Sequence, residues 1–267
     1  MTGAVEYVTS PDGTRIAFRR VGIGPPLLAI HGGLGSWRSW KQVADRLAER
    51  FEVLLFDRRG RGDSDFGTEP HTLEREVEDA LALLEVAGSG AGLLGHSFGG
   101  ALALELALAV PSRVARLAVY EPAAGVGDVI GPAEIATMER LLDDGELLAS
   151  VELGFQALAD AEFMQSAGPI AARPYAERAA LAELAPTVLR ELAAAASLGT
   201  DLGRYRALRV PTLVLAGGAS PARMRRGCTA LAEALPAGEL VELPEVAHVA
   251  HATAPDLVAD HVRAFLG

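Results

Sequence analysis

Apolar residues along the chain form short continuous runs separated by longer stretches with helical spacing. Residues 27–30 and 51–56 show no alternation of apolar and polar positions, and turn residues bound them, as expected for strands buried on both faces. Further strands are predicted at residues 91–95, 113–121, 210–216 and 239–243. The intervening helical patterns cover residues 36–50, 72–86, 98–109, 222–235 and 255–266.

Strands that alternate with helices indicate βαβ units and a mostly parallel sheet. A hairpin is predicted before them, because residues 5–8 and 15–20 flank the turn sequence Ser-Pro-Asp-Gly-Thr. We therefore expect an α/β fold with a mostly parallel central sheet and flanking helices. In such sheets ligands bind at the carboxyl ends of the strands.

The alternation stops between residues 122 and 206. This stretch is rich in Ala, Leu and Glu, has helical spacing, and is broken at Gly131-Pro132, Gly145, Gly168-Pro169 and Pro186. We predict a helical cap, residues 122–206, inserted over the sheet edge of a core formed by residues 1–121 and 207–267. Its larger apolar side chains either line an apolar pocket or pack the cap onto the core: Met138, Leu141, Phe155, Phe163, Met164 and Tyr175.

Composition excludes several classes of protein. The net charge of −11 and the lack of a basic run argue against nucleic-acid binding. The longest strongly apolar stretch, residues 101–110, is too short for a membrane span. Residues 1–13 lack the features of a secretory signal, and the single cysteine, Cys228, excludes an intramolecular disulfide. We expect a cytoplasmic protein with no membrane or nucleic-acid partner; its oligomeric state is open.

The sequence Gly95-His96-Ser97-Phe98-Gly99 stands between a predicted buried strand and a predicted helix. A serine between two glycines at this spacing is typical of a nucleophile elbow, a strained strand-to-helix turn that exposes the hydroxyl. The small neighbours allow strand and helix to approach closely. Ser97 is therefore the candidate nucleophile.

The chain resembles the α/β-hydrolase superfamily, specifically its capped branch. The resemblance rests on the elbow, on the His31-Gly32-Gly33 turn, on the Asp57-to-Ser64 loop and on a late histidine. It implies an oxyanion hole made by the backbone N–H groups of Gly33 and Phe98. The imidazole of His31 is then expected to be structural.

The resemblance also implies a general-base histidine after the last strand. His248 and His251 both follow Leu243-Pro244, and His248 aligns better with the position of the family histidine. His248 is therefore the predicted base, and His251 is expected to face the cap or to be structural. The histidines and the single cysteine show no metal-ligand spacing, so no metal site is predicted.

The sequence departs from the family at the third position of the triad. The usual acid follows the strand at residues 210–217, where Ala219 stands instead. Some capped relatives carry the acid after the strand beside the nucleophile, and Glu121 occupies that place here. Glu121 is either this relocated acid or a carboxylate of the cap hinge or substrate pocket. Asp57, Asp63 and Asp65 are weaker candidates, because nearby arginines offer ion pairs.

These observations predict a cofactor-independent serine hydrolase that acts on an ester, lactone, thioester or similar activated carbonyl of an apolar small molecule. In this scheme Ser97 attacks, His248 transfers the proton and Glu121 orients His248. The missing acid at position 219 keeps two alternatives open: a non-hydrolytic lyase or cyclase on the same scaffold, and a non-catalytic ligand-binding protein.

Overall fold

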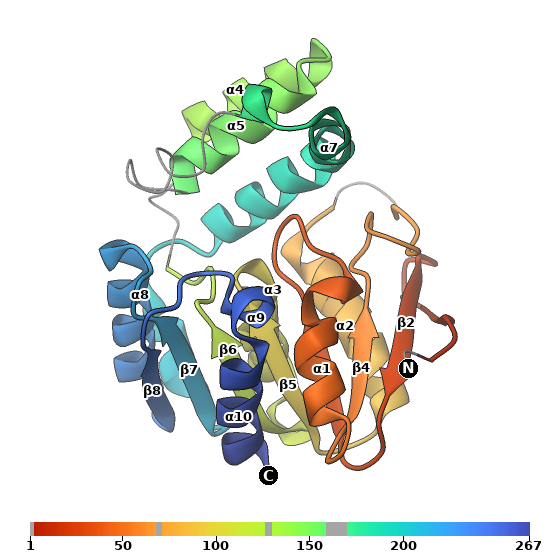
Figure 1. Ribbon diagram of the computed structural model, residues 1–267, viewed down its shortest axis with the longest axis vertical. Coiled ribbons are helices and arrows are strands. Elements are labelled where there is room, and N and C mark those ends of the chain that lie inside the picture. Colours follow the sequence, from red (N-terminus) through yellow and green to blue (C-terminus); the bar gives the residue numbers. More distant parts are fainter. Residues whose placement is uncertain (1–2, 68–70, 126–129, 159–169) are drawn as a thin grey trace. The chain divides into compact units, whose positions relative to one another are not determined.

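The core of the protein is one mixed sheet of eight strands. The computed structural model describes residues 3–67, 71–125, 130–158 and 170–267, in which the strands follow the order β1-β2-β4-β3-β5-β6-β7-β8 (Figure 1). They are β1 (Glu6–Thr9), β2 (Arg15–Val21), β3 (Pro26–Ile30), β4 (Glu52–Phe56), β5 (Ala91–His96), β6 (Val114–Tyr120), β7 (Thr212–Gly217) and β8 (Gly238–Leu243). β1 pairs with β2, and β2 with β4, in antiparallel fashion. From β4 to β8 every pairing is parallel, so the carboxyl ends of these strands share one edge.

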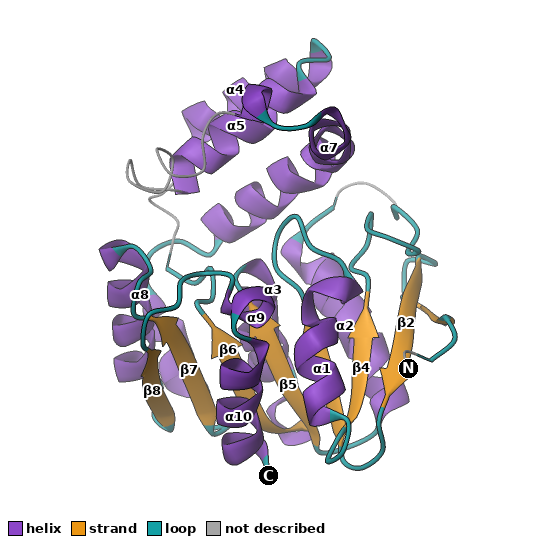
Figure 2. Ribbon diagram, in the orientation of Figure 1, coloured by secondary structure: helices purple, strands orange, loops and turns teal. Residues whose placement is uncertain are grey.

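Helices cover both faces of this sheet (Figure 2). They are α1 (Lys41–Leu47), α2 (Leu73–Ala87), α3 (Phe98–Ala109), α8 (Ala222–Ala234), α9 (Ala250–Thr253) and α10 (Pro255–Leu266). Short 3-10 turns accompany them: η1 (Trp37–Trp40), η2 (Pro111–Arg113) and η4 (Leu202–Ala207). Side chains of α1 and α10, such as Val43, Leu47 and Val262, form one buried cluster with the sheet. The predicted α/β architecture is therefore present.

One of the predicted helices is divided in the structure. Residues 36–50 were expected as one helix, but they form η1 followed by α1. Ser36 caps the first of these by accepting a hydrogen bond from the Arg38 N–H, and the Ser39 side chain bonds back to the Ser36 N–H. This reciprocal capping closes a tight first turn.

The chain divides into two units, residues 1–124 with 202–267 and residues 125–201. The described part of the second unit contains helices and no strand: α4 (Pro132–Asp143), α5 (Leu147–Leu158), η3 (Ile170–Ala172) and α7 (Tyr175–Ser197). These helices share a small core in which Val151, Ile170 and Ala185 are buried. None of the described helices is long and apolar enough to cross a bilayer.

The helix break expected at Pro186 is wrong. Pro186 lies inside α7, which continues to Ser197. Proline removes one backbone hydrogen bond of the helix. The buried residues Ala185, Val188 and Leu192 on either side keep the helix packed.

The predicted pocket-lining residues of the second unit differ in their surroundings. Met138 is fully buried, whereas Tyr175 is 80% exposed. The side chain of Phe155, and the whole of Phe163 and Met164, lie outside the described residues.

Helix α3 lies directly against the backbone of neighbouring elements. A Cβ atom at Gly99 would stand 2.4 Å from the carbonyl oxygens of both Ile30 and His31 at the end of β3. A Cβ atom at Gly95 would stand 2.4 Å from the Gly99 carbonyl. Two glycines thus permit the contact that places the N-terminus of α3 beside the ends of β3 and β5.

This contact predicts opposite effects for one substitution at two helical glycines. Gly99→Ala must displace backbone atoms and should lower the free energy of unfolding by about 2 kcal/mol or more, within the range of overpacking. Gly227→Ala, inside α8 with open space around it, should raise that free energy by about 0.5–1 kcal/mol. Urea unfolding of both variants measures the difference. A Gly99→Ala protein as stable as the parent would contradict the proposed close approach.

Candidate active site

Ser97 occupies a strained turn between β5 and α3. Its φ of 52° and ψ of −121° lie outside the regions that non-glycine residues normally adopt, at a cost of about 1–3 kcal/mol. Hydrogen bonds hold the turn from both sides, because the Ser97 N–H donates to the Tyr120 carbonyl and the Ser97 carbonyl accepts from the Gly100 and Ala123 N–H groups. The side chain is partly exposed. The predicted strand–Ser97–helix arrangement is therefore what the structure contains.

The turn after β3 approaches this serine closely. A Cβ atom at Gly32 would lie 3.1 Å from Cβ of Ser97. Phe98 is the first residue of α3, so its N–H group has no partner within the helix. In the described chain, neither the N–H of Phe98 nor that of Gly33 donates a hydrogen bond. Both groups are thus available as hydrogen-bond donors near Ser97.

His31 fixes the orientation of the peptide that carries the Gly33 N–H. Its Nε2 accepts a hydrogen bond from the Arg58 N–H at 3.1 Å, so the proton of the neutral ring is on Nδ1. Nδ1 then donates to the Gly32 carbonyl at 2.8 Å. Burial and the neighbouring Arg58 charge hold the pKa of His31 well below its usual value, so the ring stays neutral. Because the carbonyl and N–H of one trans peptide point in opposite directions, the Gly33 N–H is directed away from His31.

The Glu121 carboxylate and the His248 imidazole are in direct contact. Glu121 Oε2 lies 2.7 Å from Nδ1 of His248, and Oε1 accepts the Gly217 N–H at 2.8 Å. The carboxylate is 1% exposed and the imidazole 27% exposed. A carboxylate at this nitrogen places the ring proton on Nδ1, which leaves the Nε2 lone pair free to accept a proton.

Backbone geometry brings Glu121 to this position. Glu121 has a φ of 42°, in the left-handed region, and its N–H donates to the Leu215 carbonyl of β7. The residue that ends β6 is thereby turned toward the end of β7 and the loop after β8. Sequence reasoning placed Glu121 at this strand end but left its direction open.

Ala219 occupies a different environment. It is exposed, and its N–H donates to the Val246 carbonyl in the loop that leads to His248. The backbone at the usual acid position is therefore attached to this loop, although the side chain carries no acid.

No direct hydrogen bond joins Ser97 to His248 in the described chain. In ligand-free sites such a bond is often long. The two residues are connected through His96, which precedes Ser97 and whose Nε2 lies 2.7 Å from the His248 carbonyl. The His96 and His248 ring centroids are 4.5 Å apart.

His251 is more buried than His248, and no carboxylate of the described residues contacts it. It packs against Trp40 and His96, with ring centroids 5.3 Å and 4.3 Å away. Its Nδ1 is buried and has no hydrogen-bond partner among the described residues. Burial, aided by the nearby His248, lowers the pKa of His251 to about 4. A ring without a carboxylate partner and with this pKa is a poor candidate for the general base at neutral pH.

Asp57, Asp63 and Asp65, in the loop after β4, form ion pairs with arginines of β2. Arg19 of β2 contacts both Asp63 and Asp57, and Arg15 of β2 binds Asp65. The loop arginines turn inward instead: Arg58 pairs with Glu76 and Arg59 with Asp79, both on α2. These ion pairs tie the loop to β2 and α2.

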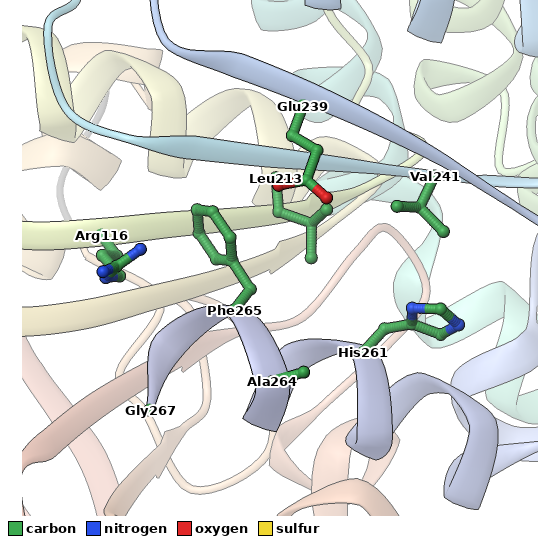
Figure 3. Close-up of a pocket in the computed structure, with 8 residues that line it drawn as sticks. All are labelled: Arg116, Leu213, Glu239, Val241, His261, Ala264, Phe265 and Gly267. Atoms are coloured by element: carbon green, nitrogen blue, oxygen red, sulfur yellow. The ribbon is translucent and has the colours of Figure 1, made fainter.

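A separate cavity of about 320 Å³ lies near the amino ends of the parallel strands, away from the carboxyl ends that carry Ser97 and Glu121. Figure 3 shows the residues that line it. Arg116, Leu213 and Glu239 contribute to it from the amino-terminal halves of β6, β7 and β8. It contains none of the predicted site residues. Among the described residues, no group of three or more His, Cys, Asp or Glu side chains is placed to hold a metal ion.

Comparison with known proteins supports the fold described above. The chain is 32% identical to an alpha/beta hydrolase from Sphaerobacter thermophilus, whose crystal structure superposes with a TM-score of 0.85 over 98% of this chain and 100% of that one. A hydrolase from Pseudomonas aeruginosa is 28% identical, with a TM-score of 0.77 over 99% of each chain. The soluble epoxide hydrolase of a Corynebacterium species is 32% identical over 118 residues, which are 43% of this chain and 41% of that protein.

The chain matches only part of such curated relatives, between 26% and 41% of their lengths for three of them. The sequence profile of the alpha/beta hydrolase family, in contrast, matches residues 27–261, which include the turn after β3, the elbow and the loop that carries His248. The protein is therefore a member of the alpha/beta hydrolase family.

Proposed function

We propose that this protein is a serine hydrolase that cleaves an ester, lactone, thioester or similar activated carbonyl of an apolar small molecule. The observation that carries the proposal is the 2.7 Å contact between Glu121 and His248. Glu121 thereby provides the carboxylate for His248 that is missing at position 219. Membership of a hydrolase family supports an enzymatic role.

In the proposed reaction Ser97 Oγ attacks the carbonyl carbon of the substrate. Nε2 of His248 accepts the hydroxyl proton and passes it to the leaving alcohol or thiol, which leaves an acyl group on Ser97. Water then attacks this ester with the same histidine as base, and Ser97 is regenerated. The N–H groups of Gly33 and Phe98 donate to the oxyanion that forms in each half of the reaction.

Glu121 is suited to stabilise the imidazolium that forms in both steps. Its carboxylate is buried, and one oxygen accepts a backbone N–H while the other contacts Nδ1 of His248. The negative charge of Glu121 contributes to the raised pKa values of Tyr120 and Cys228, after burial as the main cause. Such a desolvated, fixed carboxylate interacts with a developing positive charge more strongly than one in water.

The contact also bears on the alternatives. A lyase or cyclase, or a ligand-binding protein, gained support from the missing acid at position 219. With Glu121 at His248, the chain has a nucleophile, a base, an acid and two oxyanion donors that together favour acyl transfer. No observation of the structure specifically favours either alternative.

The assignment of nucleophile and base predicts distinct phenotypes for three substitutions. A fluorophosphonate probe should label Ser97, and Ser97→Ala should abolish labelling. His248→Ala should lower hydrolysis of a small activated ester by several orders of magnitude, because the serine then has no base. His251→Ala should retain most of the activity.

Mass spectrometry of the labelled protein and ester kinetics check these outcomes. Loss of activity in His251→Ala but not in His248→Ala would reverse the assignment of the base. Failure of the probe to label Ser97 in the folded protein would contradict a serine hydrolase.

Glu121→Gln tests the relocated acid. Glutamine keeps the shape but not the charge, so kcat should fall by about three to four orders of magnitude, as for loss of a triad carboxylate. Glu105→Gln is the matched control, because Glu105 binds Arg204 and Tyr205 instead of His248 and should leave kcat unchanged.

Adding Ala219→Asp to the Glu121→Gln protein should restore part of the activity, since Ala219 stands at the usual acid position. A Glu121→Gln enzyme with the kcat of the parent would remove Glu121 from the mechanism. Ester kinetics of the single and double variants make this comparison.

A further inference from the structure

The loop that carries His248 is held by three consecutive backbone carbonyls. The Val246 carbonyl accepts the Ala219 N–H at 2.9 Å, the Ala247 carbonyl accepts the Tyr120 hydroxyl, and the His248 carbonyl accepts Nε2–H of His96 at 2.7 Å. The donors stand at or just after the ends of β7, β6 and β5, three adjacent strands of the sheet. The loop itself follows β8. Its position is therefore set by strands other than the one from which it emerges.

Two of these donors are side chains next to the proposed catalytic residues. His96 immediately precedes Ser97, and Tyr120 immediately precedes Glu121. At the ends of β5 and β6, one residue thus belongs to the proposed site, and the residue before it donates a hydrogen bond to the His248 loop. The acceptors are carbonyl oxygens, so His96 must carry its proton on Nε2 and Tyr120 must donate its hydroxyl proton.

Both donors are suited to a permanent hydrogen bond. His96 is 7% exposed, and Tyr120 is fully buried. Burial and the nearby His248 and His251 hold the pKa of His96 well below its usual value. Burial and the charge of Glu121 raise the pKa of Tyr120, so its hydroxyl remains protonated. Neither residue contacts the hydroxyl of Ser97 by a hydrogen bond in the described chain.

The rings around His248 leave little freedom to the loop. His96 packs with its ring 4.5 Å from that of His248 and 5.4 Å from that of Tyr120. The backbone of Gly32 also lies close to His96, since a Cβ atom added at Gly32 would stand 2.8 Å from Nδ1 of His96. His96 therefore contacts both the turn after β3 and the His248 loop.

We propose that His96 and Tyr120 are positioning residues, which hold the backbone of Ala247 and His248 so that the imidazole meets the Glu121 carboxylate and Ser97. The proposal rests on the function assigned to Ser97, His248 and Glu121. It gives a role to the histidine of the elbow and to the tyrosine of β6, neither of which takes part in the reaction itself.

The test compares variants that remove or keep each donor. His96→Leu and Tyr120→Phe delete a donor to the loop, whereas His96→Gln places an amide N–H near the position of Nε2. Loss of either donor should lower kcat at least about tenfold with KM within about threefold, because small displacements of a catalytic group are costly. His96→Gln should restore most of the loss seen in His96→Leu.

Tyr205→Phe is the matched control. Tyr205 is also a buried tyrosine, but its hydroxyl binds Glu105 on α3. The Tyr205→Phe protein should have a lower free energy of unfolding without a comparable loss of kcat. Thermal unfolding of every variant separates a change in stability from a change in position.

A spectroscopic measurement makes the test independent of turnover. The Nδ1–H proton of His248, bound to Glu121, should give a far-downfield proton NMR signal that disappears in His248→Ala. The signal should broaden or shift in His96→Leu and Tyr120→Phe and return in His96→Gln.

The outcomes separate the two proposals. If the wild-type protein hydrolyses no activated ester and Ser97 is not labelled, the proposed function fails, and the NMR signal still decides whether the loop is held. If His96→Leu and Tyr120→Phe leave kcat and the signal unchanged, the positioning role is wrong. It is also wrong if kcat falls as far in His96→Gln as in His96→Leu. The same holds if the decrease in kcat of every variant is proportional to its decrease in thermal stability. Should His96→Leu fail to fold, Tyr120→Phe alone carries the test.

Discussion

The close approach of α3 to the backbone of β3 is the constraint on which the rest of the site depends. Without side chains at Gly95 and Gly99, the first turn of α3 rests on the carbonyls of Ile30 and His31. This contact places Ser97, the unpaired N–H of Phe98 and the turn at Gly32 next to one another. A single added methyl group at either glycine would collide with backbone atoms and force these segments apart.

Backbone strain concentrates at the same edge of the sheet. Four non-glycine residues of the described chain have positive φ: Leu34, Ser97, Glu121 and Glu245. Each follows the carboxyl end of a parallel strand, namely β3, β5, β6 and β8. Residues in such conformations persist where the surrounding structure fixes them. For Ser97 and Glu121 this is done by backbone hydrogen bonds to the neighbouring strands β6 and β7. The edge that carries the proposed chemistry is thus also the least relaxed part of the backbone.

Much of the fold follows from local patterns in the sequence. The continuous apolar runs and the glycine pair around Ser97 are local signals, and the strands and α3 lie where these signals place them. Pro186 misled the prediction because tertiary packing outweighs one lost helical hydrogen bond. The short helix α9 was missed, since four residues have no periodicity to detect.

The candidate site was less accessible to sequence reasoning. Strand order let the sequence place Glu121 beside the nucleophile strand, but its positive φ, which turns the carboxylate toward His248, has no signature in the residues around it. The roles of His96 and Tyr120 depend on contacts across more than 100 residues of chain, with His248 and Ala247 respectively. Their position immediately before Ser97 and Glu121 was the signal available.

The place where the helical unit leaves the core has a consequence for how this protein can vary. Residues 125–201 are inserted after Glu121, and the chain re-enters the core at η4, where Arg204 and Tyr205 bind Glu105 of α3. Just before the segment begins, the Ala123 N–H donates to the Ser97 carbonyl, so the core holds the chain at both ends of the insertion. Every residue of the proposed site lies outside the inserted segment. A change in the length or sequence of this segment therefore leaves every residue of the proposed site in place.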